Sequence, residues 1–298
     1  MVVADKRASY KIGNTINFII LVFLCAVMLY PFIYFFALSL NDGYDAMKGG
    51  IYFWPRKFTL ENYATAFRNE NIINAFVISV LRTVIGTVTM VFLRSTVGYA
   101  LSRKQLWGRT PITFYFYLTT LISGGMVPGY ILLRQLHLLN NFWIYILPGL
   151  YSFFDIVMLR TYFSGIPDEL EEAACVDGCS SVRTFFQIYL PLAKPILATL
   201  ALFAAVGHWN EWFTGAFYIT DTKLQPAATL LQKLIEETDF TKSGATGDKL
   251  NQLMSSQKTT PEALRVTFVM ILTIPIVCVY PFLQKYFVKG VMIGAIKS

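Results

Sequence analysis

Charged residues are scarce in this 298-residue chain. They make up 14% of it, against roughly 25% in average soluble domains. Hydrophobic residues reach 55%. These proportions exclude an ordinary soluble domain and predict an integral membrane protein. The net charge of +7 does not indicate nucleic-acid binding, because the lysines and arginines stand largely beside apolar runs, where they orient membrane proteins.

Residues that bind metals or form disulfides are also few. The two histidines are isolated from each other, and the four cysteines comprise two in apolar runs and a pair four residues apart. A zinc site would need further ligands near that pair, Cys175 and Cys179. We therefore expect no metal site and no disulfide framework. The chain also lacks a G-x-x-x-x-G-K-[ST] phosphate loop and any nucleophile–base signature, so we expect neither an ATPase site nor a catalytic residue.

Long apolar runs predict six transmembrane helices and an all-α, polytopic fold, since about 20 apolar residues cross a hydrocarbon layer of about 30 Å. The first run is longer than the core of a signal peptide and is expected to be retained. Basic residues before it, at 103–109 and in the tail 288–298 place both termini in the cytoplasm. The expected spans are 17–40, 74–101, 110–133, 142–163, 195–219 and 266–287.

Two polar stretches lie between spans on the expected external side. Residues 41–71 are expected to form a loop with some short structure. Residues 220–262 are expected to form a larger external segment. Within it, residues 227–237 show the periodicity of an amphipathic helix.

Two arginines fall inside the second expected span. Twelve helical residues, about 18 Å, separate Arg82 from Arg94. Each would therefore lie close enough to an interface for its side chain to snorkel into it. Contact with a substrate is the alternative. Asp155 and Glu211 are the acidic residues inside spans, and they keep open a proton relay of the kind found in secondary carriers.

Two further features indicate a substrate path. Gly124, Gly125, Pro128 and Gly129 interrupt the third span, and loosened backbone at membrane depth is tolerated only inside protein or beside water. A simple packing kink is the alternative. In the fifth span, Trp209 and Trp212 lie about 60° apart on a continuous helix, with Asn210 at the margin of their face. Such a face suits weak sugar binding, and interfacial anchoring is its alternative.

The stretch from Glu172 to Pro191 reads EAACVDGCSSVRTFFQIYLP and predicts two short helices joined by a turn. Pro167 suits a first helical turn, and Gly178 offers a left-handed stop after the helix. Ser180 or Ser181 can cap a second helix, which Pro191 limits. The small side chains of Ala173 and Ala174 would let the surface of a partner approach this hairpin closely. An ordinary helical hairpin that binds no partner is the alternative.

This stretch resembles the EAA signature, E-A-A-x3-G-x9-I-x-L-P, of permease subunits from bacterial ABC importers. Every defined position matches: Glu172, Ala173, Ala174, Gly178, Ile188, Leu190 and Pro191. The resemblance implies the type I permease fold of ABC importers. It also implies that residues 164–194 form a cytoplasmic loop that docks on an ATPase subunit through these seven residues.

Other segments resemble the maltose-type sugar permeases, namely 58–67, 97–111 and the tail FVKGVMIGAIKS. Residues 124–150 and 205–213 resemble a branch of that family that serves complex oligosaccharides in Gram-positive bacteria. The resemblance implies a first part, 1–73, with one span and an external loop. It implies a core permease domain over 74–298.

The family resemblance implies a five-part importer in the bacterial cell membrane. This chain would pair with a second, related permease, while two ATPase subunits bind ATP and Mg²⁺. An extracellular binding lipoprotein would deliver the sugar, and the chain itself would need no cofactor. The alternatives are an ABC permease for a non-sugar solute and an ion-coupled carrier, for which paired broken helices in an internal repeat would be expected. A membrane scaffold would leave the signature unexplained.

Overall fold

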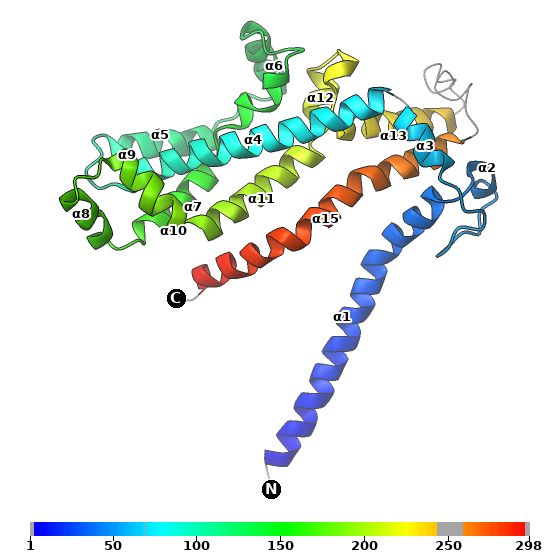
Figure 1. The fold of residues 1–298 in the computed structure, drawn as a ribbon, viewed down its shortest axis with the longest axis horizontal. Helices are drawn as coiled ribbons and strands as arrows, with labels where there is room; N and C mark the ends of the chain where they lie inside the picture. Colours follow the sequence, from blue (N-terminus) through cyan, green and yellow to red (C-terminus); the bar gives the residue numbers. More distant parts are fainter. Residues whose placement is uncertain (1–2, 69, 243–258, 296–298) are drawn as a thin grey trace. The chain divides into compact units, whose positions relative to one another are not determined.

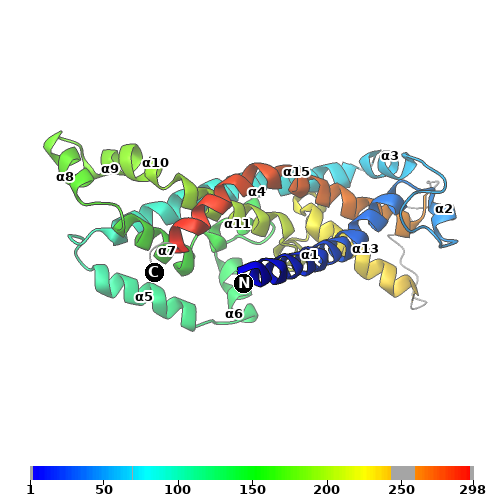
Figure 2. The same cartoon turned by 90° about the horizontal axis from the view of Figure 1, so that it is seen from below.

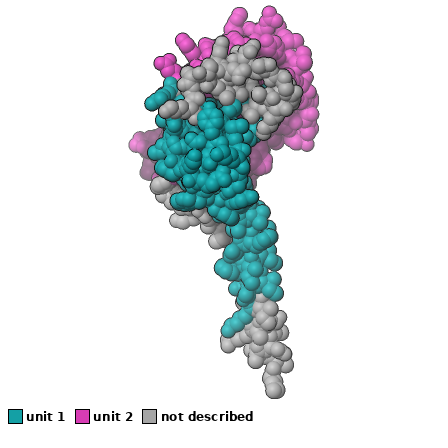
Figure 3. All heavy atoms as spheres, turned by 90° about the vertical axis from the view of Figure 1, so that its right-hand side faces the viewer, with its two compact units in different colours: residues 1–69, 233–273 teal, residues 70–232, 274–298 magenta. Residues whose placement is uncertain are grey.

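The computed structural model describes residues 3–68, 70–242 and 259–295, whose fold is drawn in Figure 1. Within these ranges the regular structure is helical, apart from an isolated antiparallel bridge between Asn41 and Phe58. The all-α prediction is confirmed. The chain divides into two compact units, coloured separately in Figure 3: residues 1–69 with 233–273, and residues 70–232 with 274–298.

The first unit contains α1 (Val3–Ser39), α2 (Gly43–Ala46), α3 (Glu61–Arg68) and the beginning of α15 (Pro261–Ala295). The short structure expected in the loop 41–71 is therefore present. Its backbone is held by the buried side chain of Asn62, whose amide donates to the carbonyl oxygens of Ser39 at 2.9 Å and Asn41 at 2.8 Å. These bonds matter because a buried loop must pair its own polar groups.

The second unit is built around the long helix α4 (Glu70–Ser102), which runs beside α7 (Phe153–Ser164) and α11 (Lys194–Asn210) in Figure 1. α4 approaches α7 closely at Gly98, where a Cβ atom would lie 2.7 Å from Cβ of Leu159. The missing side chain thus permits the contact. The remaining helices of this unit are α5 (Arg109–Leu121), α6 (Met126–Gln135), α8 (Glu169–Val176), α9 (Ser181–Thr184), α10 (Leu190–Leu192) and α12 (Phe213–Phe217), and α13 (Ala227–Lys242) begins in it.

Three helical segments are long and apolar enough to cross a membrane unaided: Gly13–Ser39, Glu70–Ser102 and Pro261–Cys278. Three further pairs of helices meet the same test together but are bent. They are Arg109–Leu121 with Met126–Gln135 (118°), Phe142–Gly149 with Phe153–Ser164 (52°), and Ser181–Leu192 with Lys194–Asn210 (80°). Counting each pair as one broken span gives up to six spans within the described residues.

The breaks have local causes. The interruption expected in the third span is confirmed at Gly125, whose φ of +81° and ψ of −178° suit only glycine. The fourth span, expected over 142–163, is bent by 52° between its two helical parts. It begins with two 3₁₀ turns, Phe142–Tyr145 and Leu147–Gly149, and α7 restarts where the Ser152 hydroxyl accepts from the Asp155 N–H.

The fifth span is also shorter than expected. α11 ends at Asn210, Glu211 is extended with φ −69° and ψ 119°, and α12 begins at Phe213. In the predicted external segment, the amphipathic helix expected over 227–237 is confirmed as α13. Residues 243–258 of that segment lie outside the described residues.

Candidate functional site

The stretch that carries the signature folds as the expected hairpin, with α8, α9 and α10 together at one end of the second unit (Figure 2). α8 stops at a turn in which Gly178 has φ +74°. The Gly178 N–H donates to the Cys175 carbonyl oxygen at 3.0 Å, and the Cys179 N–H donates to that of Ala174 at 2.9 Å. This is the Schellman pattern, which requires a left-handed residue at the glycine position. The left-handed helix stop predicted at Gly178 is confirmed.

The second half of the hairpin begins as expected but does not end where expected. The Ser180 hydroxyl accepts from the Arg183 N–H at 3.4 Å and caps α9. A π turn at Phe185–Tyr189 follows and leads into α10. The expectation that Pro191 limits this helix was wrong, because Pro191 lies in the first turn of α10. There its missing N–H is tolerated, and the sharp bend comes after Leu192.

The seven signature residues divide by exposure. The side chains of Glu172 and Ala173 are exposed, as is Pro191. Ala174 is buried, while Ile188 and Leu190 pack against a buried cluster. The exposed residues therefore lie on the surface of the hairpin, whereas Ala174, Ile188 and Leu190 hold the hairpin to the rest of the unit. The sequence signature alone does not show which of its residues are exposed and which are buried.

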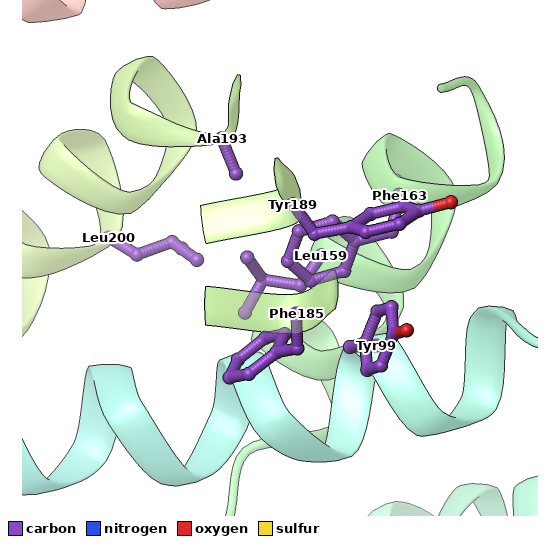
Figure 4. Close-up of a cluster of buried hydrophobic side chains, with 7 residues drawn as sticks. All are labelled: Tyr99, Leu159, Phe163, Phe185, Tyr189, Ala193 and Leu200. Atoms are coloured by element: carbon purple, nitrogen blue, oxygen red, sulfur yellow. The ribbon is translucent and has the colours of Figure 1, made fainter. Parts of the chain in front are cut away.

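The buried cluster that anchors the hairpin is shown in Figure 4. Its aromatic centre joins Tyr99 of α4 to the hairpin, with ring centroids 5.0 Å from Phe185 and 4.9 Å from Tyr189. Apolar burial of this kind contributes roughly 25 cal/mol per Å². Its members are Tyr99, Leu159, Phe163, Phe185, Tyr189, Ala193 and Leu200. The hairpin is thereby packed against both α4 and α7.

A polar clamp stands beside this cluster and was missed by sequence reasoning. Arg103, just after α4, forms an ion pair with Glu171 of α8 and donates to the Tyr189 hydroxyl at 2.8 Å. Its guanidinium carbon also lies 4.5 Å from the Tyr189 ring centroid and 4.9 Å from that of Tyr99.

A second ion pair links the same two parts of the chain at the surface. Lys104 Nζ lies 3.3 Å from a carboxylate oxygen of Asp168, and the two side chains are 79% and 65% exposed. The corresponding exposures of Arg103 and Glu171 are 15% and 29%. Exposed pairs contribute about 0–1 kcal/mol. The Arg103 clamp is therefore the stronger link between the end of α4 and the hairpin.

The expectation that Arg82 snorkels to an interface was wrong. Its side chain is fully buried and lies 3.2 Å from the Glu211 carboxylate. It also donates to the backbone carbonyl oxygen of Glu211 at 2.5 Å and lies over the Tyr145 ring at 5.1 Å. Because α11 ends before Glu211, the Glu211 carbonyl oxygen has no donor from a continuing helix. Arg82 supplies that donor instead.

Arg94 is likewise held inside the protein, so the snorkelling expectation fails here too. It forms an ion pair with Asp155 and donates through Nε to the Leu150 carbonyl oxygen at 3.1 Å. It also donates to the carbonyl oxygen of Gly149. The broken start of the fourth span exposes these carbonyl groups, and a cation satisfies them.

Trp209 and Trp212 do not share one face of a helix, as expected for the fifth span, because α11 ends at Asn210, between the two residues. Trp209 is 9% exposed and packs edge-on against Phe76 at 5.6 Å. Trp212 is 37% exposed and meets Phe213 and Phe217. The Asn210 amide donates to the Val206 carbonyl oxygen of its own helix at 3.0 Å. Only Trp212 of this pair presents a substantial open surface.

Gly125 and Pro128 lie at the start of α6, and no residue of α5 or α6 is buried within the chain. The assignment of Trp209, Asn210, Trp212, Gly125 and Pro128 to a substrate path stays a prediction. Among the described residues, no group of three or more His, Cys, Asp or Glu side chains is placed to hold a metal ion.

Comparison with known proteins places these features in a family. The family described as "Binding-protein-dependent transport system inner membrane component" matches residues 125–293. The "Polygalacturonan/rhamnogalacturonan transport system permease protein YtcP" of Bacillus subtilis (strain 168) is 36% identical over 90% of this chain and 92% of its own length. "Protein LplC" of the same organism is 33% identical over 97% of this chain and 96% of its own length.

A solved structure is similar along almost the whole chain. It is described as a "bacterial ABC transporter involved in the import of the acidic polysaccharide alginate". The similarity has a TM-score of 0.86 at 27% sequence identity and covers 94% of this chain and 98% of the other. The fold of this chain is therefore that of a permease from an ABC importer.

Proposed function

The chain belongs to the family of binding-protein-dependent transport system inner membrane components, and from this premise we propose that it passes an oligosaccharide across the bacterial cell membrane as part of an ATP-driven importer. It is a multi-pass membrane protein and a permease. The observation that carries the proposal is the hairpin 164–194. It exposes Glu172 and Ala173 on α8, and its second half packs against α4 and α7 through Phe185 and Tyr189.

The proposed partners follow from this arrangement. A second, related permease completes the path, and two ATPase subunits bind ATP and Mg²⁺ and dock on the hairpins. An extracellular binding lipoprotein delivers the sugar to the external side, which includes 41–71 and 220–262. Both termini then lie in the cytoplasm. In this scheme the chain needs neither a cofactor nor an ATPase site of its own.

The mechanism is a shift between outward-facing and inward-facing states. ATP drives this shift only if it binds the complex more tightly in one of the two states. We propose that Glu172 offers a charged contact to the ATPase and that Gly178 fixes the angle between the hairpin helices. The cluster around Tyr99 and the Arg103 clamp then pass the movement to α4 and α7, because packed elements move together.

We propose further that the transported oligosaccharide carries carboxylate groups. The similar transporter of known structure imports an acidic polysaccharide. Polygalacturonan, in the name of the relative with 36% identity, is a chain of uronic acids. An ion-coupled carrier is disfavoured, because the acidic residues available for a proton relay, Asp155 and Glu211, are each paired with an arginine.

The test changes the two proposed coupling residues in the complete complex. Glu172→Lys reverses the charge of the exposed contact. Gly178→Val forces a branched side chain into a left-handed conformation that costs roughly 1–2 kcal/mol even for an unbranched residue. We expect both variants to insert in the membrane, to lose most of the co-purified ATPase and to lose uptake of trigalacturonate.

Glu61→Lys is the matched control, since Glu61 is an exposed acid at the start of α3, outside the hairpin. It should retain the ATPase and the uptake. Normal ATPase recovery together with normal uptake in either hairpin variant would contradict the proposed coupling role.

A further inference from the structure

We propose that Arg109 and Arg160 form a binding subsite for the carboxylate groups of the transported sugar. This inference rests on the proposed function and adds a location and two recognition residues to it. Arg109 is the first residue of α5, and Arg160 lies near the end of α7. The proposed topology puts both at the cytoplasmic end of the spans, where an imported substrate leaves.

The two arginines line two neighbouring cavities of the second unit, both of which are open to its surface. One cavity has a volume of about 550 Å³ and the other about 340 Å³, and both arginines line each of them. Sites for small molecules are typically about 300–1,000 Å³. The space beside the arginines is therefore large enough for at least one sugar unit.

Within the described residues, no counter-ion balances the positive charge in these cavities. The residues that line them include no aspartate or glutamate, and neither arginine forms an ion pair within the described residues. In the part of the chain that the structure describes, Arg109 Nε is enclosed without a hydrogen-bond partner, whereas Arg160 donates to the Thr113 hydroxyl at 3.3 Å. An enclosed donor without an acceptor is unfavourable, and a bound anion would satisfy it.

The other arginines of this unit that lie along the spans make the contrast clear. Arg82, Arg94 and Arg103 each meet an acidic side chain of the same chain. Arg109 and Arg160 instead line the same two cavities and have no acidic partner among the described residues. Guanidinium groups bind carboxylates with two parallel hydrogen bonds, so the pair is suited to an acidic group that comes from outside the chain.

The remaining walls suit a sugar ring better than a lipid chain alone. Phe114, Tyr117 and Phe153 provide aromatic surface, with the Tyr117 and Phe153 rings 5.9 Å apart. Thr110 and Thr113 place hydroxyl groups beside the arginines. Sugars combine apolar C–H faces with polar edges, so a site lined by aromatic rings together with hydroxyl and cationic groups matches an acidic sugar.

The membrane potential opposes the entry of an anionic substrate, and a positively charged subsite would offset part of that cost. Moving one negative charge into a cell with an inside-negative potential costs about 2.3 kcal/mol per 100 mV. A positive site on the cytoplasmic side lowers the energy of the anion at the end of its path. The site must remain weak, because the substrate has to leave it.

The test uses the complete importer with its binding protein in proteoliposomes of phosphatidylcholine. The probes are trigalacturonate and its fully methyl-esterified form, which has the same length and no charge. The variants are Arg109→Gln, Arg160→Gln and the charge-conserving Arg160→Lys. Arg134→Gln is the control, because Arg134 is an exposed arginine in the last turn of α6 that lines neither cavity.

We expect the two glutamine variants to lower uptake of trigalacturonate about tenfold, the effect of one lost interaction of about 1.4 kcal/mol. Uptake of the methyl ester should be unchanged. Arg160→Lys should fall between Arg160→Gln and the unaltered protein, and Arg134→Gln should transport both probes normally. Equal loss of both probes in the glutamine variants would assign the arginines a structural role and overturn the proposal, as would no loss of either.

A second arm distinguishes a lipid phosphate from the sugar carboxylate. If added phosphatidylglycerol stimulates the unaltered complex but not Arg160→Gln, the anion is a lipid headgroup, and the proposal is overturned. Failure of the unaltered complex to transport trigalacturonate while it transports the methyl ester would refute the acidic substrate itself. That outcome is separate from normal trigalacturonate uptake by the arginine variants, which would refute only the subsite.

Discussion

The clamp between Arg103 and Glu171 predicts a measurable energetic link between α4 and the hairpin. Removing one member of a fully buried ion pair costs about 3–5 kcal/mol, while exposed pairs contribute about 0–1 kcal/mol. The side chains of this pair are 15% and 29% exposed, between these cases. We therefore expect a coupling energy of about 2 kcal/mol, roughly a thirtyfold change in an equilibrium constant.

The measurement is a double-mutant cycle with Arg103→Ala, Glu171→Ala and the double variant. Unfolding of the purified permease in mixed micelles gives the three free-energy changes, and their non-additivity gives the coupling energy. Arg103→Ala alone should cost more than the coupling energy, because it also loses its contacts with the Tyr99 and Tyr189 rings.

The exposed pair Lys104–Asp168 supplies an internal control. It joins the same two parts of the chain at 3.3 Å and should give a coupling energy below about 1 kcal/mol. In transport, Arg103→Ala should raise the number of ATP molecules hydrolysed per sugar, whereas Lys104→Ala should not. Equal coupling energies for the two pairs would refute the conclusion that burial makes the Arg103 clamp the principal link.

Two further predictions concern the tryptophans and the membrane topology. Trp209→Ala should lower the free energy of unfolding by about 3–5 kcal/mol, as truncation of a buried tryptophan does, while Trp212→Ala should lower it much less and reduce uptake instead. The reverse pattern in thermal unfolding and uptake would contradict the burial difference. Thr222→Cys, at an exposed position in a background without the four native cysteines, should react with an impermeant maleimide in intact cells. Labelling only after permeabilisation would contradict an external segment 220–262.

The hairpin was predictable because its signals are local. Gly178 marks the left-handed turn, and Ser180 caps the helix that follows within a few residues. The long apolar runs likewise predict spans from composition alone. The prediction for Pro191 was wrong because a proline disrupts a helix when it lies in the interior, not when it lies in the first turn. The π turn Phe185–Tyr189 ends just before Leu190, so Pro191 falls in the first turn of α10.

The polar contacts between spans were not predictable, because their partners are far apart in the sequence. Glu171 lies 68 residues after Arg103, and Glu211 lies 129 residues after Arg82. The break after Asn210 also lacks a glycine or proline beside it, so its local sequence predicts a continuing helix. Arg82 of α4 stabilises the break by binding Glu211, and the sequence around Asn210 carries no sign of that contact. The wrong prediction of a shared tryptophan face follows from this.

The pairing of Arg82 with Glu211 has a consequence for biogenesis. Spans enter the membrane in the order in which the ribosome makes them, so α4 arrives with Arg82 long before Glu211 is synthesised. An arginine at the centre of a span raises the free energy of insertion by about 2.5–3.5 kcal/mol, which the apolar remainder of the 33-residue α4 must offset. Until α11 arrives, the half-made chain carries an unpaired cation at membrane depth. A chain truncated before residue 211 keeps Arg82 unpaired within the membrane. Membrane quality control could recognise this unpaired arginine and so distinguish incomplete permeases from finished ones.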